Sequence, residues 1–248
     1  MSRKSLRRQV AKAYLLTKPV NFRIFYDEDH VAFFPKLGLC FNRIKKSGNT
    51  SIAARLFELE NGVVAGSDFK RHMRNPVNVT LAESSHYDQL FCFAISRNPY
   101  TRALSSYLDK VGRGSLERFS LPGFGMNNRE GFRLFLEALE DEVLSHNRHF
   151  WPQSDLLFQP IEKYGHIGKI ENIAAEMHAV FEKCGLDTNW AQAFAKPHSV
   201  EAGTGKITSA REKLSAFYDD HNIRLVQQIY SDDFENFQYS LDFGGALH

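Results

Sequence analysis

The stretch from Leu90 to Arg102, LFCFAISRNPYTR, is the most informative part of this 248-residue chain for its fold class. Its first six residues, Leu90–Ile95, form an unbroken apolar run without alternation. Such a run is typical of a strand that is buried on both faces in a parallel sheet covered by helices. Asn98 and Pro99 then match the N-cap and the first position of a helix. A buried strand that leads at once into a helix predicts one unit of an α/β sheet.

The same order of strand, turn and helix occurs upstream. Leu39–Ile44 is predicted as a strand, and Ser47–Thr50 turns the chain. Apolar residues at helical spacing then predict a helix over Ser51–Glu60. Because strand, turn and helix repeat, we predict an α/β fold with a central, mostly parallel sheet flanked by helices on both faces. Ligands of such sheets bind at the carboxyl ends of the strands, so the turns that follow them are the places to search.

Three further elements are predicted downstream. Tyr164–Ile170 is predicted as a short strand, and Ile173–Cys184 as a helix that ends at Gly185. A capping box that begins at Ser209 predicts one long C-terminal helix reaching Ile229.

A single domain over residues 1–248 is the expected organisation for this length. Residues 1–30 are interpreted as an N-terminal extension with a basic start. The segment 112–128 combines glycine and proline with aromatic residues, which predicts a loop and makes it a candidate lid over a ligand. A surface connection without function is the alternative for that loop.

Composition excludes several classes of protein. Lysine and arginine number 31 and aspartate and glutamate 29, and this near balance gives no support for bulk electrostatic binding to nucleic acid. The sequence contains no apolar run long enough for a transmembrane segment and no signal-peptide pattern, so a cytoplasmic location is expected. The three cysteines are far apart and form neither a disulfide framework nor a metal-type pair.

The turn after the first predicted strand, RIKKSGNTS over residues 43–51, has the composition of an anion-binding loop. Gly48 permits a sharp turn, and the backbone amides of a helix N-terminus favour phosphate or sulfate. It is not a Walker A loop, because Lys46 precedes its only glycine. A helix cap with solvated lysines is the alternative for this loop taken alone. The candidate binding residues are Lys45, Lys46, Ser47, Gly48, Asn49, Thr50 and Ser51.

The turn after the second strand supplies a second candidate anion site. Arg97 leaves the end of the buried strand, where its planar guanidinium can hold a phosphate through two parallel hydrogen bonds. Ser105 follows on the predicted helix, where its hydroxyl can reach the same phosphate. A structural salt bridge for Arg97 and a packing position for Ser105 are the alternatives.

Together these two loops resemble the phosphate sites of the sulfotransferase superfamily, whose members use 3′-phosphoadenosine 5′-phosphosulfate (PAPS). Lys45–Ser51 resembles the 5′-phosphosulfate loop, and Phe93–Tyr107 the 3′-phosphate motif. Asn147–Gln153 and Tyr164–Asn172 resemble the H-x-x-P-Q and G-[RK]-x-E-[NT] elements of the Golgi-type carbohydrate sulfotransferases (sulfotransferase family 2) and their bacterial relatives. The resemblance runs in order from about Phe41 to Tyr239.

The sequence departs from the family pattern in a few places. Lys45 stands where proline is usual, and Asn98 replaces the commoner aspartate. The transmembrane anchor and lumenal cysteines of the Golgi enzymes are not found in this sequence, which favours the bacterial type and leaves the acceptor open.

The resemblance implies transfer of a sulfuryl group from PAPS to a hydroxyl of a carbohydrate or another small acceptor, with adenosine 3′,5′-bisphosphate as product and no metal. Lys46 aligns with the family lysine that stabilises the leaving phosphate. The loop 45–51 is then implied to hold the 5′-phosphate, and Arg97 and Ser105 the 3′-phosphate. The motifs carry no information on the oligomeric state.

Sulfuryl transfer needs a general base, and histidine is the usual choice. His72 is the first candidate because it lies between the two phosphate motifs, where relatives carry a histidine element. His149, in the H-x-x-P-Q element, comes next, and His86 third. A surface or packing histidine is the alternative for each.

Two other classes of function stay open at this point. A P-loop-like nucleotide kinase needs magnesium and a carboxylate at a strand end, and we find no such carboxylate in the sequence. The Walker-like segment Gly203–Thr208 lacks the first glycine and is predicted as a surface loop. A non-catalytic protein that binds an anion or nucleotide on the same fold is the other alternative.

Overall fold

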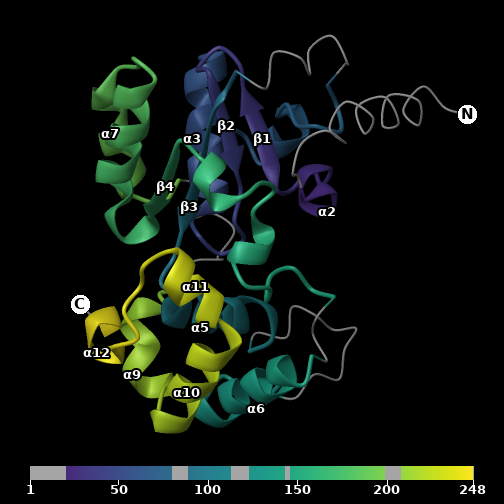
Figure 1. Ribbon diagram of the computed structural model, residues 1–248, viewed down its shortest axis with the longest axis vertical. Helices are drawn as coiled ribbons and strands as arrows, with labels where there is room; N and C mark the ends of the chain where they lie inside the picture. The colour runs from purple at the N-terminus through teal and green to yellow at the C-terminus, as the bar shows by residue number, and fades with distance from the viewer. Residues whose placement is uncertain (1–20, 80–88, 113–122, 143–145, 199–207, 248) are drawn as a thin grey trace, which may run out of the picture. The chain divides into compact units, whose positions relative to one another are not determined.

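A computed structural model of the chain describes residues 21–79, 89–112, 123–142, 146–198 and 208–247 (Figure 1). The chain divides into two compact units, and each draws on segments far apart in the sequence. Unit 1 takes its described residues from Met1–Ile44, Gly48–Ser96 and Leu156–Gly203, and unit 2 from Lys45–Ser47, Arg97–Asp155 and Thr204–His248. The expectation of a single domain with an N-terminal extension stays a prediction.

Unit 1 is built on a four-stranded sheet in the order β1-β2-β3-β4. β1 and β2 are antiparallel, whereas β2 with β3 and β3 with β4 are parallel. Phe41 pairs with Phe93 in the parallel register, and their rings stack with centroids 4.9 Å apart. The predicted α/β fold with a mostly parallel sheet is confirmed. The strands are β1 (Val31–Phe34), β2 (Leu39–Asn42), β3 (Phe91–Ser96) and β4 (His166–Lys169).

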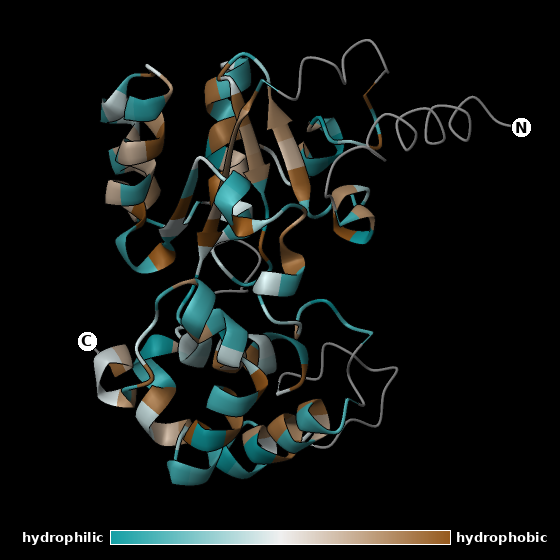
Figure 2. Ribbon diagram, in the orientation of Figure 1, coloured by the Kyte–Doolittle hydropathy of each residue, from teal (hydrophilic) through white to brown (hydrophobic). Residues whose placement is uncertain are grey.

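The two faces of this sheet are covered differently. Apolar residues of β1, β2 and β3 form one core with α3 (Asn49–Asn61), α7 (Ile173–Lys183) and the 3₁₀ segment η5 (Thr188–Ala195). On the other side, the short helix α2 (Phe22–Phe25) places the ring of Phe25 6.4 Å from Phe33 and 5.2 Å from Phe158. Figure 2 shows β1, β2 and β3 as mostly hydrophobic, in keeping with the burial of most of their residues, whereas β4 includes the polar residues His166 and Lys169 and is only partly buried.

Unit 2 consists of helices around an aromatic core. The rings of Tyr107 and Phe132 lie 5.4 Å apart, and those of Phe132 and Tyr218 5.1 Å apart. The helices are α5 (Pro99–Lys110), α6 (Arg129–Glu140), α9 (Leu214–Phe217), α10 (Asp220–Ile229), α11 (Ser231–Asn236) and α12 (Phe243–Leu247). The remaining 3₁₀ segments of the described chain are η1 (Phe69–His72), η2 (Ser154–Leu156), η3 (Ile161–Lys163), η4 (Ile170–Asn172) and η6 (Arg211–Lys213).

The helix signals at α5 and α7 are confirmed. The Asn98 side chain accepts a hydrogen bond from the Tyr100 amide at 3.0 Å, and Pro99 takes the first helical position. α7 is followed by Gly185, whose φ of +66° is the left-handed conformation expected at that point.

The prediction of one long C-terminal helix is wrong. The chain is extended at Tyr218, and a new N-cap begins at Asp219, whose side chain accepts from the Asn222 amide at 2.9 Å. The buried Tyr218 hydroxyl donates to the carbonyl of Tyr100 at 2.7 Å. This tertiary bond and the second cap divide the segment into α9 and α10, which the capping box at Ser209 does not reveal.

The candidate lid, residues 112–128, is described at Gly112 and over 123–128, since residues 113–122 lie outside the described part of the chain. Gly123 has a φ of +79°, and a Cβ there would lie 2.1 Å from the carbonyl oxygen of Gly131 on α6. The Tyr107 hydroxyl on α5 donates to the Met126 carbonyl. Residues 123–128 are therefore fixed against α5 and α6, and the lid itself stays a prediction.

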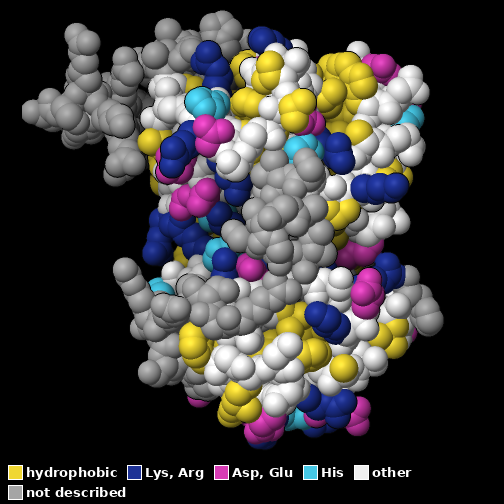
Figure 3. Space-filling view, turned by 180° about the vertical axis from the view of Figure 1, so that it is seen from behind, with side chains coloured by type: hydrophobic (Ala, Val, Ile, Leu, Met, Phe, Trp, Pro, Cys, Tyr) yellow, Lys and Arg dark blue, Asp and Glu magenta, His cyan; other side chains and the backbone are white. Residues whose placement is uncertain are grey.

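The surface carries both signs of charge, in keeping with the net charge of +2. On the face shown in Figure 3, lysine and arginine side chains lie among aspartate and glutamate side chains. Within the described ranges, no helix has the length and apolar character needed to cross a membrane. Cys40, Cys92 and Cys184 are free thiols.

Candidate functional site

The first predicted anion loop is divided between the two units. Gly48–Ser51 belongs to unit 1, where Gly48 precedes α3 with a φ of +67°. A Cβ at this position would lie 2.5 Å from Cδ1 of Ile170, so glycine is favoured by conformation and by space. α3 begins without a side-chain cap and without an acidic residue in its first turn. The positive end of its dipole is therefore not neutralised by its own first turn, as an anion site requires.

Asn49 is held from within unit 1 by Arg43. The Arg43 Nε donates to Asn49 Oδ1 at 2.7 Å, and its Nη1 donates to the Glu28 carbonyl at 3.2 Å. Burial lowers the pKa of Arg43 to about 10, against the opposing effect of Asp29 and Asp27. This arrangement gives Asn49 a structural partner that its place in the motif did not suggest.

Thr50 and Ser51 also have partners in unit 1. Lys70, on η1, donates from Nζ to Thr50 Oγ1 at 3.4 Å. Ser51 Oγ accepts from the His198 amide at 2.9 Å. Lys70 is thus a cation at the loop that sequence reasoning missed, although it belongs to the same short segment as the candidate His72.

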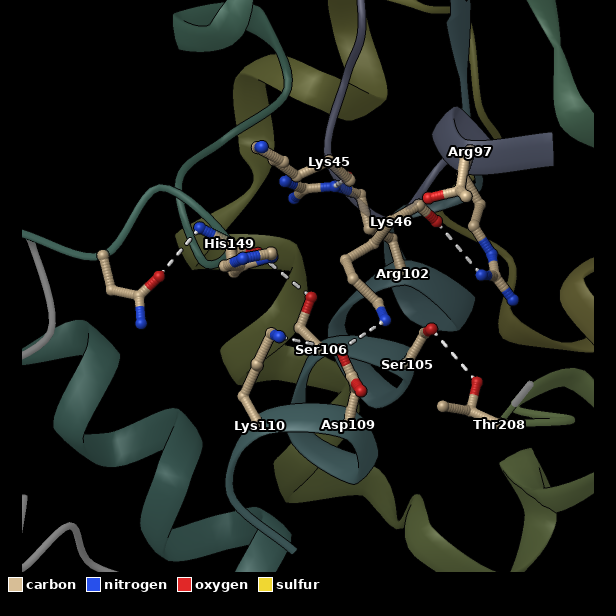
Figure 4. A network of polar contacts seen from close by, with 12 residues as sticks. Lys45, Lys46, Arg97, Arg102, Ser105, Ser106, Asp109, Lys110, His149 and Thr208 are labelled. Carbon is tan, nitrogen blue, oxygen red and sulfur yellow. Dashed lines mark hydrogen bonds and ion pairs between the residues drawn. The ribbon is translucent and has the colours of Figure 1, made fainter. Parts of the chain in front are cut away.

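The other part of the loop, Lys45–Ser47, belongs to unit 2 and is held there at three consecutive residues, of which Figure 4 labels Lys45 and Lys46. Each of the three is hydrogen-bonded to a side chain from another predicted motif. Arg102 Nε donates to the Lys45 carbonyl at 3.0 Å, Arg97 Nη1 to the Lys46 carbonyl at 3.1 Å, and Ser47 Oγ to Gln153 Oε1 at 3.1 Å. Three motifs predicted separately are therefore joined by direct hydrogen bonds.

Gln153 links these segments from a fully buried position. Its Oε1 accepts from the Arg97 amide and its Nε2 donates to the Arg97 carbonyl, both at 2.8 Å. The backbone amide of Gln153 donates to Asp233 Oδ2 at 2.8 Å. Sequence reasoning noted Gln153 only as part of the H-x-x-P-Q element and did not include it among the site residues.

Lys46 combines an unusual backbone conformation with a charge that is mostly shielded from water. Its φ is +70°, a conformation that non-glycine residues adopt mainly where the surroundings impose it. Its Nζ lies 3.1 Å from Asp109 Oδ2. Burial lowers the pKa of the Lys46 ammonium, the Asp109 carboxylate opposes this effect, and Arg97 and Lys110 add to it.

Asp109 is a second residue that the sequence did not single out. Its Oδ2 also lies 3.2 Å from Lys110 Nζ. Burial raises the pKa of the Asp109 carboxyl, but Lys46 and Lys110 more than offset this effect and hold the pKa below its usual value. The only sequence signal was its position four residues after Ser105, on the same side of α5.

The two candidate 3′-phosphate residues both lie in unit 2. Arg97 is oriented by a second bond, from its Nε to Thr101 Oγ1 at 3.1 Å. Ser105 is buried, and its hydroxyl lies 3.1 Å from Thr208 Oγ1. Thr208 is itself buried, so the surface-loop prediction is wrong at this residue, which packs beside Ser105.

The three candidate bases lie in different surroundings. His86 is outside the described residues. His72 lies in unit 1 with its side chain 65% exposed, and its Nε2 is 3.5 Å from Asp68 Oδ2. His149 lies in unit 2 and is partly buried. Burial and the positive charges of Lys110, Lys45 and Lys46 lower the pKa of His149 to about 3, so its imidazole is neutral at physiological pH.

Comparison with known proteins gives the family. The sulfotransferase family model matches residues 29–240, which include both anion loops, Gln153 and Asp109. The chain belongs to the sulfotransferase family. No curated protein and no solved structure gave a significant match.

Membership of this family confirms the resemblance, and the sequence match and the mostly parallel sheet agree on the fold. The protein is a sulfotransferase, an enzyme that transfers a sulfuryl group to an acceptor. Among the described residues of this sulfotransferase, no group of three or more histidine, cysteine, aspartate or glutamate side chains is arranged to hold a metal ion.

Proposed function

We propose that this sulfotransferase moves the sulfuryl group of PAPS to a hydroxyl of a carbohydrate or another small acceptor. The observation that carries the proposal is the bonding of Lys45–Ser47 to Arg97, Arg102 and Gln153 in unit 2. It brings the loop that resembles a phosphosulfate motif together with the segment that resembles a 3′-phosphate motif. A donor with phosphate groups at both its 3′ and 5′ positions suits such a pair.

The residues of unit 2 fit an anionic donor. Two of their buried polar atoms, Arg102 Nη2 and His149 Nδ1, have no hydrogen-bond partner among the described residues. Buried polar atoms normally have partners, and a bound polar ligand is one source of them. PAPS, when bound, supplies a sulfuryl group on a good phosphate leaving group, so the protein's tasks are to position the reactants and to stabilise charge.

Lys46 is the proposed electrostatic catalyst. Its ammonium neutralises the negative charge that develops on the leaving phosphate oxygen. The hydrogen bond from Arg97 Nη1 to the Lys46 carbonyl holds Lys46 in its left-handed conformation. A cation fixed before the reaction stabilises the transition state without reorganising.

Arg97 and Ser105 are the proposed ligands of the 3′-phosphate. The bond to Thr101 keeps the Arg97 guanidinium oriented, and a planar fork in a fixed orientation suits two-point recognition of a phosphate. The Ser105 and Thr208 hydroxyls lie together and can both turn toward an anion. This set selects a 3′-phosphorylated nucleotide over ATP. The predicted contribution of Gly48–Ser51 through backbone amides stays part of the proposal.

His149 is the base that we favour, and His72 and His86 remain alternatives. A general base must be unprotonated before it accepts the proton of the acceptor hydroxyl. Lys110, Lys45 and Lys46 lower the pKa of His149, and Lys45 and Lys46 are proposed to face the donor's phosphates. Anionic groups beside these lysines offset their charge, which raises the pKa of His149 toward the range of an effective base.

The test is a transfer assay with PAPS labelled in its sulfuryl group, a panel of carbohydrate acceptors and EDTA in the buffer. We expect labelled, sulfated acceptor from the wild type. Lys46→Met should lower kcat by about 10² to 10³-fold, which is the usual loss for one transition-state donor. Lys163→Met, at an exposed position, is the matched control and should keep full activity. No transfer to any hydroxyl acceptor, together with binding of the nucleotide, would instead indicate a non-catalytic protein.

A further inference from the structure

Asp109 is the acidic partner of the proposed electrostatic catalyst. α5 carries Ser105 and Asp109 on one side, four residues apart. One carboxylate oxygen, Oδ2, faces two ammonium groups, at 3.1 Å from Lys46 and 3.2 Å from Lys110. The three side chains are 13%, 10% and 19% exposed, in the order Lys46, Asp109, Lys110. The cluster is therefore mostly shielded from water. Figure 4 shows the Lys46 and Lys110 side chains converging on Asp109.

A shielded lysine loses its charge unless a neighbour supports it. Burial favours the neutral amine. The charged groups that act on Lys46 are Asp109, Arg97 and Lys110, and Asp109 is the only one of these that favours the ammonium form. The titratable His149 faces the same cluster, where Lys46 and Lys110 lower its pKa and Asp109 raises it. A neutral Lys46 cannot stabilise a leaving phosphate, so the lysine depends on its partner.

We propose that Asp109 is a positioning residue for sulfuryl transfer, holding Lys46 in place as an ammonium ion until the anionic donor becomes its partner. This inference rests on the proposed function, in which Lys46 acts on the leaving phosphate. Asp109 touches neither reactant and acts through Lys46.

Lys110 makes this pairing exchangeable. Because both ammonium groups share one oxygen of Asp109, the attraction of the carboxylate is divided between them. Lys110 remains as the counter-ion of Asp109 when Lys46 turns to the donor. A buried carboxylate is therefore never left unpaired, which would be costly.

The proposal predicts opposite shifts for two substitutions. Asp109→Asn removes the charge that supports the ammonium, so the pKa of Lys46 falls. Activity is lost as pH rises through that pKa, so the alkaline limb of the kcat profile moves toward lower pH, by about 1 to 3 on the pH scale. At a fixed pH on that limb, a displacement of about one pH unit lowers kcat about tenfold. Lys110→Met removes a competing cation and moves the limb to higher pH.

The experiment measures kcat and KM against pH for the wild type, Asp109→Asn, Asp109→Glu and Lys110→Met. Glu130→Gln is the matched control, because it also removes one carboxylate from unit 2, at an exposed pair with Arg133. We expect Asp109→Glu to restore most of the alkaline limb and Glu130→Gln to match the wild type. Lys110→Met keeps the test valid if Asp109→Asn does not fold.

A second readout does not depend on the donor. The side-chain NMR signal of Lys46, assigned with Lys46→Arg, is titrated in each folded variant without ligand. The proposal expects its titration to move to lower pH in Asp109→Asn and to higher pH in Lys110→Met. Unchanged titration and an unchanged alkaline limb in these variants would overturn it. If the wild type transfers no sulfuryl group from PAPS, the proposed function fails, while the NMR titration still tests the pairing.

Discussion

Replacing Gln153 with alanine should strongly destabilise unit 2. The Gln153 side chain bonds to both the amide and the carbonyl of Arg97, and it also accepts from Ser47 Oγ. Since Gln153 is fully buried, alanine leaves these partners without water to replace the lost bonds. Each buried polar group left unsatisfied costs about 1 to 3 kcal/mol. The two backbone groups of Arg97 alone therefore predict a loss of about 2 to 6 kcal/mol in the free energy of unfolding.

The assay is urea denaturation of the wild type and Gln153→Ala, followed by fluorescence and circular dichroism. Gln159→Ala is the matched control, because among the described residues the Gln159 side chain makes one hydrogen bond, to the Lys163 carbonyl at 3.1 Å, near the surface. We expect the control to lose less than about 1 kcal/mol. If Gln153→Ala is no less stable than this control, the hydrogen bonds that Gln153 forms with Arg97 and Ser47 contribute less to the free energy of unfolding than predicted.

Two further predictions concern Gly48 in the first anion loop and the partly buried His149. Gly48→Ala should lower the free energy of unfolding by about 1 to 2 kcal/mol from backbone strain, plus the cost of moving Ile170. Gly62→Ala isolates the strain, because Gly62 has a φ of +68° and open space around it. Equal losses of the two variants in thermal denaturation would show that the Ile170 contact is unimportant. The pKa of His149 is lowered from 6.5 to about 3 in the folded state. Between these two pH values the unfolded chain protonates His149 and the folded protein does not. The stability of the folded state is therefore unaffected by the titration of His149 above about pH 6.5 and falls as pH decreases toward 3. His149→Gln should reduce the slope of the free energy of unfolding against pH in that range by up to about 1.4 kcal/mol per pH unit. The slope is measured from urea denaturation of the wild type and the variant at several pH values. Identical slopes would contradict the burial of a neutral imidazole.

Local signals in the sequence were sufficient for much of the fold. The Asn98 cap with Pro99 sets the start of α5 through contacts within a few residues, and the apolar run at Leu90–Ile95 reports the burial of β3 directly. The break at Tyr218 was not predictable, because it depends on a hydrogen bond to Tyr100, 118 residues away in the sequence.

The candidate site shows the same division between local and distant contacts. The first loop was predictable because its glycine, lysine and hydroxyl residues are close together in the sequence. The partner of Lys46 is 63 residues away, and the spacing of Asp109 from the loop carries no signal of its own. The order of the histidine candidates also depends on burial, which favours His149 over the exposed His72 only once the chain is folded.

Recognition of a 3′-phosphorylated nucleotide is tested by calorimetric titration with adenosine 3′,5′-bisphosphate, AMP and Mg-ATP. Wild type and Arg97→Ala are compared, with Arg133→Ala as the control at an exposed arginine of unit 2. We predict that the wild type and the control bind the bisphosphate, that AMP binds far more weakly because it lacks the 3′-phosphate, and that Arg97→Ala loses this preference. Tighter binding of Mg-ATP than of the bisphosphate would contradict a PAPS site and favour a nucleotide kinase.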